Sequence, residues 1–167
     1  MDRLLNRIVN VAVILACAAV VIHLSLYAYH LRTPAVPPVY AKGAKIPDTK
    51  ELGFSSAQRT LILVTHSQCH FCQESMPFYK RLTNAAHKEG VRVVGLSAED
   101  LAVHRDFLTW GGLYVDFVGS MAVNGIKVRG TPTLIEVDRR GVVLSSWEGT
   151  VSPAKEPDME ASLIPGR

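Results

Sequence analysis

One short stretch decides the fold of this chain: Thr65-His66-Ser67-Gln68-Cys69-His70-Phe71-Cys72. The apolar run 61–64 leads into it with the length of a buried strand, and a helical pattern leads out from Cys72. Two cysteines separated by two residues therefore stand where a strand ends and a helix begins. A helix N-terminus offers unpaired N–H groups and a partial positive charge, which favour a thiolate. Because the second sulfur can reach a mixed disulfide formed by the first, we expect Cys69 to attack and Cys72 to resolve.

Two prolines add weight to this redox interpretation over half a zinc site or a surface disulfide. Pro77 lies five residues after Cys72, where the first turns of the helix would be kinked. The segment Gly130-Thr131-Pro132-Thr133 precedes another apolar run. An X-Pro bond just before a strand is a suitable place for a cis peptide.

These features resemble the thioredoxin superfamily, in particular its membrane-anchored TlpA/ResA-like redoxins. The resemblance covers roughly residues 45–150 and includes the two cysteines, Pro77, the 130–133 segment and the ending Ile135-Glu136-Val137-Asp138-Arg139-Arg140-Gly141-Val142-Val143. It implies an α/β fold with a mixed sheet flanked by helices. It also implies that Pro132 is cis and packs beside the active-site sulfurs, and that the backbone of Thr131 docks an extended substrate.

The chain departs from thioredoxin itself around the cysteines. Gln68 stands in place of a tryptophan, His70 and Phe71 in place of Gly-Pro, and Leu63 in place of a buried acid. A charged His70 would stabilise the Cys69 thiolate and make the disulfide more oxidising, whereas the resemblance favours a reductase. The direction of electron flow is therefore left open.

Hydrophobic periodicity predicts the order of secondary structure. We expect buried strands at 59–65 and 91–96, a short strand at 114–118, and a hairpin of strands at 133–137 and 142–147. We expect a helix from Cys72 to about Lys88, a second from Ser97 as N-cap to about Trp110, and a short tail helix around 158–163.

The N-terminal part predicts a membrane anchor. Residues 8 to about 29 are almost wholly apolar and long enough to cross a hydrocarbon core of roughly 30 Å. A cleaved signal peptide is the alternative, but its apolar region is usually shorter, about 7–15 residues. We divide the chain into an anchor (1–32), a proline-rich spacer (33–44), a thioredoxin-like domain (45–151) and a C-terminal tail (152–167).

The expected location is the cell membrane, crossed once, with the redox domain on the periplasmic or other extracytoplasmic side. Disulfide chemistry has targets there. The expected partners are thiols and disulfides of client proteins and a membrane electron donor or acceptor, with no cofactor. The net charge is +3 and no basic cluster stands out, so we expect no nucleic-acid partner. The third cysteine, Cys17, lies in the apolar run and is interpreted as a small apolar residue.

The sequence thus predicts a membrane-anchored thiol–disulfide oxidoreductase with Cys69 and Cys72 as its catalytic residues. His70, Thr131 and Pro132 are expected to tune the site or dock the client. One alternative is a copper- or zinc-binding chaperone, since two thiols and two imidazoles could serve as ligands, namely His66, Cys69, His70 and Cys72. Another is a noncatalytic thioredoxin-like module that holds a partner.

Overall fold

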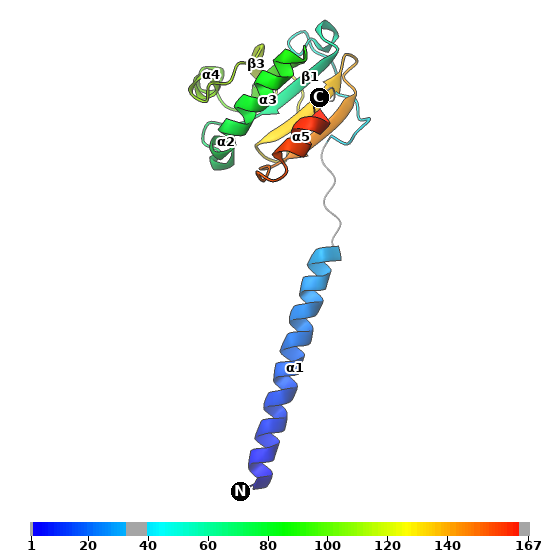
Figure 1. The fold of residues 1–167 in the computed structure, drawn as a ribbon, viewed down its shortest axis with the longest axis vertical. Helices are drawn as coiled ribbons and strands as arrows, with labels where there is room; N and C mark the ends of the chain where they lie inside the picture. Colours follow the sequence, from blue (N-terminus) through cyan, green and yellow to red (C-terminus); the bar gives the residue numbers. More distant parts are fainter. Residues whose placement is uncertain (1, 33–39, 164–167) are drawn as a thin grey trace. The chain divides into compact units, whose positions relative to one another are not determined.

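The computed structural model describes residues 2–32 and 40–163 (Figure 1). The chain divides into two compact units between Val36 and Pro37. Residues 33–39, which make up most of the predicted spacer, lie outside the described residues, as does the end of the predicted tail, 164–167.

The first unit contains one long helix, α1 (Asp2–Arg32). Its segment Arg7–Tyr27 has 21 residues and a mean hydropathy of 2.5, so it is long and apolar enough to cross a membrane. Large apolar side chains between Ile8 and Tyr27 are 51–66% exposed. An apolar helix whose side chains remain exposed in this way fits a membrane anchor or a signal sequence.

The second unit is built on one five-stranded mixed sheet. Its strand order is β3-β2-β1-β4-β5. Parallel pairing joins β1 to β2 and β2 to β3, whereas β4 is antiparallel to both β1 and β5. The five strands are β1 (Arg59–Val64), β2 (Arg92–Ser97), β3 (Phe117–Ser120), β4 (Thr133–Asp138) and β5 (Val143–Glu148). The predicted mixed sheet and its C-terminal hairpin are confirmed.

Helices cover the sheet, as predicted. They are the short 3-10 helix η1 (Phe54–Ser56) and the α-helices α2 (His70–Glu74), α3 (Met76–Lys88), α4 (Leu101–Trp110) and α5 (Glu156–Leu163). Strand β1 alternates between the two faces of the sheet, because successive side chains point in opposite directions. Leu61 and Leu63 pack with α3 and α5, which lie over the same face in Figure 1. Ile62 and Val64 pack on the other face against the segment that precedes β1, with Ile46, Leu52 and Phe54.

The predicted helix 72–88 is in fact two helices. The first begins at His70, and Ser75 separates it from α3. Pro77 occupies the first turn of α3, where its missing N–H would have no partner within the helix in any case. The kink expected from Pro77 is thus a complete break one turn after Cys72.

The prediction that Ser97 caps the second helix is wrong. Asp100 is the N-cap of α4, and its Oδ1 accepts hydrogen bonds from the backbone N–H groups of Ala102 (2.8 Å) and Val103 (3.3 Å). Ser97 is instead the last residue of β2 and remains paired with β3. Its hydroxyl donates to the carbonyl of Thr65 at 2.8 Å, which ties the ends of β1 and β2 together.

Candidate active site

The two cysteines lie at the start of α2, after a short loop that follows the end of β1. Cys69 is the N-cap of α2, and its sulfur accepts a hydrogen bond from the backbone N–H of Cys72 at 3.2 Å. The carbonyl of Cys69 accepts from the backbone N–H of Gln73 at 3.1 Å. The sulfur therefore takes the place of the oxygen that usually caps a helix, and a hydrogen bond of this kind stabilises a thiolate.

A second segment, far away in the sequence, meets this sulfur. The peptide bond between Thr131 and Pro132 is cis, which confirms the expectation from the resemblance. The Cys69 thiol lies 3.3 Å from the carbonyl oxygen of Thr131 and donates to it. The Pro132 carbonyl accepts from the N–H of Gly149 at 2.8 Å, and this fixes the segment to the end of β5. The structure thus brings Cys69, Cys72, Thr131 and Pro132 together.

The two thiols differ in exposure. Both are free, but Cys69 is partly exposed while Cys72 is completely buried in the cluster that contains Leu63. Burial, reinforced by the hydrogen bond with Cys69, raises the pKa of the Cys72 thiol from 9.0 to about 12. An external partner can therefore reach only the sulfur of Cys69 directly.

The residues between the cysteines face solvent. The His70 side chain is 74% exposed, and its Nε2 lies 3.1 Å from Oε1 of Glu74 one turn later. Phe71 is 55% exposed and packs against the His70 ring, with 5.8 Å between the ring centroids. The His70 imidazole thus has a carboxylate partner of its own on the outer side of α2.

Sequence reasoning missed Glu99, a neighbour of the loop that carries Cys69. Its carboxylate oxygens accept from the backbone N–H of Ser67 at 2.9 Å and from the Ser67 hydroxyl at 2.5 Å. The two residues are 32 positions apart in the chain. Because the parallel strands β1 and β2 end at the same edge of the sheet, an acid just after β2 was the available signal for this contact.

The alternative metal ligands are not gathered into one group. His66 Nδ1 accepts from the N–H of Gln68 at 3.1 Å and lies 3.6 Å from Oε2 of Glu99. His70 is paired with Glu74. Within the described ranges 2–32 and 40–163, no three His, Cys, Asp or Glu side chains are arranged to hold a metal ion.

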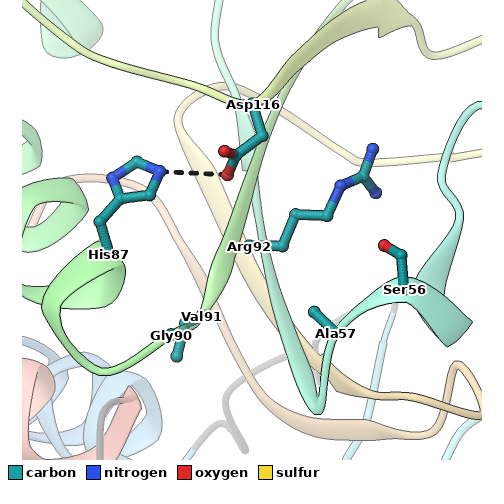
Figure 2. Close-up of a pocket in the computed structure, with 7 residues that line it drawn as sticks. All are labelled: Ser56, Ala57, His87, Gly90, Val91, Arg92 and Asp116. Atoms are coloured by element: carbon teal, nitrogen blue, oxygen red, sulfur yellow. Dashed lines mark hydrogen bonds and ion pairs between the residues drawn. The ribbon is translucent and has the colours of Figure 1, made fainter.

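A separate pocket of about 310 Å³ lies away from the cysteines (Figure 2). The end of α3 and the start of β2 line it, whereas the cysteines lie at the start of α2. In Figure 2, His87 and Asp116 point toward one another, with 3.0 Å between Nε2 and Oδ2. The same oxygen of Asp116 accepts from the backbone N–H of Val93 at 2.7 Å. This pair therefore ties α3 and the start of β3 to β2.

No family model matches the sequence, and no curated protein matches it. Solved structures do match the fold. A thiol:disulfide interchange protein from Bacteroides sp. is 15% identical, with a TM-score of 0.59 over 76% of this chain and 92% of its own. Peroxidoxin BcpB from Mycobacterium tuberculosis is 16% identical, with a TM-score of 0.59 over 77% of this chain and 99% of its own.

A third match is a secreted disulfide oxidoreductase from Mycobacterium tuberculosis that is homologous to Escherichia coli DsbE. It is 14% identical and has a TM-score of 0.51, with 64% of this chain and 80% of its own chain covered. These identities are low enough that the likeness concerns the fold. The chain has the thioredoxin fold, in agreement with its resemblance to the thioredoxin superfamily.

Proposed function

We propose that this protein is a membrane-anchored thiol–disulfide oxidoreductase that exchanges disulfides with client proteins on the extracytoplasmic side. One observation carries the proposal: the partly exposed Cys69 sulfur lies 3.3 Å from the Thr131 carbonyl, with a fully buried Cys72 thiol behind it. Thiol–disulfide exchange requires an accessible attacking thiol next to a second thiol that can resolve the mixed disulfide.

In the reducing direction, the Cys69 thiolate attacks one sulfur of a client disulfide. A mixed disulfide forms, and the other client sulfur leaves as a thiolate. Cys72 then loses its proton and attacks the sulfur of Cys69. The second client sulfur leaves, and Cys69 and Cys72 are left joined by a disulfide. The client gains two electrons and two protons, and a membrane electron donor must reduce the pair again.

The client segment is proposed to dock beside Cys69. The Thr131 backbone stands next to the reacting sulfur, where an extended chain could pair with it. The exposed ring of Phe71 adds an apolar contact on the α2 side. His70 lies at the same surface and could contact the client as well as influence Cys69.

The charges around the pair favour the reducing direction. A dithiol becomes oxidising when its reduced form is stabilised as a thiolate. Here two carboxylates lie around the cysteine loop: Glu74, which is paired with His70, and Glu99, which accepts hydrogen bonds from Ser67; negative charge disfavours a thiolate. We therefore propose a reduction potential nearer the thioredoxin value of about −270 mV than the oxidising value of about −120 mV.

The helix α1 is proposed to anchor the protein, with the thioredoxin-fold unit outside the cytoplasm. Support comes from the exposed apolar surface of the segment Arg7–Tyr27. Oxidising compartments are also where client disulfides persist and need reduction or rearrangement. Carbonate extraction of membranes tests the anchor, and protease accessibility in intact cells tests the side.

The exchange activity is tested with the full chain in detergent and insulin as the disulfide substrate. Cys69→Ser should abolish reduction of insulin, because no other reachable thiol stands at the site. Cys17→Ser is the matched control, since it removes a thiol from α1 and should retain wild-type activity. If Cys69→Ser reduced insulin as fast as the wild type, the proposed activity would be wrong and a noncatalytic module would be favoured.

A further inference from the structure

Every polar group of Ser67 makes a hydrogen bond. Its N–H and hydroxyl both donate to the Glu99 carboxylate, at 2.9 Å and 2.5 Å. Its carbonyl accepts from the side-chain amide of Gln73 in α2, at 2.7 Å. Ser67 stands two residues before Cys69, so their Cα atoms are at most about 7.6 Å apart. The contact with Glu99 therefore holds the loop that presents the attacking sulfur.

The Glu99 carboxylate is held in its ionised form. Burial alone would raise its pKa, but the hydrogen bonds from Ser67, the nearby His66 imidazole and the Ser97 hydroxyl outweigh burial and lower the pKa. The side chain is only 9% exposed, so water screens its charge weakly. A negative charge is thus fixed on the loop that carries Cys69.

Two imidazoles lie near this carboxylate, and they differ in charge. His104, in α4, is buried and donates to or accepts from the Thr65 hydroxyl at 2.9 Å. Burial lowers the pKa of His104 to about 4, so it is neutral at pH 7. His66 lies 3.6 Å from Glu99 and is 37% exposed. Replacing Glu99 by glutamine removes one carboxylate charge from this cluster.

We propose that Glu99 is a positioning residue of the dithiol site, which holds the Cys69 loop through Ser67 and makes the Cys69–Cys72 pair more reducing. The inference rests on the exchange function proposed above. A fixed negative charge disfavours the Cys69 thiolate and hence the reduced form. The same carboxylate keeps the loop in place, so its charge acts from one constant position.

The test uses the full chain in detergent with Cys17→Ser as the background, so that only Cys69 and Cys72 can be alkylated. The protein is equilibrated with defined ratios of reduced and oxidised glutathione, and the reduced fraction is read from the mass shift after alkylation. We expect Glu99→Gln to move the equilibrium constant toward reduced protein by about threefold or more, from the loss of one nearby charge.

Asp100→Asn is the matched control. It removes the same charge from the adjacent residue, but Asp100 bonds only the start of α4 and not the cysteine loop. We expect the equilibrium constant of this variant to stay at the value of the background protein. Glu99→Asp retains the charge and should leave the equilibrium constant closer to the background value than Glu99→Gln does.

A Glu99→Gln shift no larger than that of Asp100→Asn would overturn the proposal, as would a loss of thermal stability with no change in the equilibrium constant. If Glu99→Gln does not fold, Glu99→Ala decides, because it also removes the charge, and an equilibrium shifted no further than that of Asp100→Asn overturns the proposal. In those cases the background protein still exchanges with glutathione, and the exchange function stands. A background protein that does not exchange at all would refute both.

Discussion

The burial of Cys72 makes a strong quantitative prediction about its reactivity. The perturbation is the double variant Cys17→Ser, Cys69→Ser, which leaves Cys72 as the only thiol in the chain. Alkylation by iodoacetamide requires the thiolate, so its rate follows the thiolate fraction. The folded variant should therefore react far more slowly than an ordinary cysteine.

The magnitude follows from the pKa of Cys72. It is raised from 9.0 to about 12, a difference of 3, and each unit lowers the thiolate fraction about tenfold at neutral pH. This gives a reduction of about a thousandfold. Part of the shift comes from Cys69, which the variant lacks, but burial is the largest cause and remains. We therefore expect at least about a hundredfold slower alkylation.

The assay follows alkylation at pH 7 by mass spectrometry, with the same variant in denaturant as the reference for an unburied thiol. The rate in the folded state should still be rising above pH 10, whereas the denatured reference should level off near pH 9. A folded variant alkylated as fast as the denatured one would refute the assignment of Cys72 as a buried resolving thiol.

Two further predictions concern the stability of the thioredoxin-fold unit. Glu136 is 1% exposed and paired with Arg59 at 3.1 Å, so Arg59→Ala should lower the free energy of unfolding by about 2–3 kcal/mol in denaturant titration. The control Arg140→Ala removes a side chain that is 76% exposed and should change the free energy of unfolding by less than about 0.5 kcal/mol. Equal effects of the two substitutions would contradict the buried pairing. Because the pKa of His104 falls to about 4 in the folded state from 6.5, the unfolded chain binds the extra proton first as the pH falls, so stability should be full above pH 6.5 and decline from there to about pH 4. His104→Gln should reduce this decline as followed by thermal unfolding, and an unchanged pH profile would show that another group causes it.

The strands β1, β2, β4 and β5 and the C-terminal hairpin were predictable because their side chains alternate or run apolar between clear turn residues. The short strand expected at 114–118 was misplaced, since β3 is Phe117–Ser120. The start of the first helix was not, since a cysteine sulfur caps it at Cys69 and sequence rules expect Ser, Thr, Asp or Asn there. Ser97 was misassigned for the opposite reason. It is a good capping residue by type, but its carbonyl accepts from the N–H of Met121 at 2.9 Å, and this keeps it in the sheet.

The cysteine pair was predictable from local spacing, and the proximity of Pro132 from the family resemblance alone. Glu99 was missed although an acid directly after β2 was a signal for it, because the contact with Ser67 follows only once β1 and β2 are known to end at the same edge of the sheet. The orientation of His70 toward Glu74 was also out of reach, since a side chain in a tight turn can face either the sulfur or the solvent. The contact of Glu99 with Ser67 depends on segments that lie apart in the sequence, whereas His70 and Glu74 are one helical turn apart and their pairing depends on side-chain orientation.

The division of labour between the two cysteines is tested most directly by trapping. Full chains carrying Cys72→Ser or Cys69→Ser, each in the Cys17→Ser background so that Cys17 cannot react, are mixed with a disulfide-bonded client such as insulin and compared on a non-reducing gel. Without a resolving thiol, Cys72→Ser should accumulate a stable mixed disulfide through Cys69, and Cys69→Ser should form none. Mixed disulfide formed by Cys69→Ser, or by neither variant, would contradict attack by Cys69.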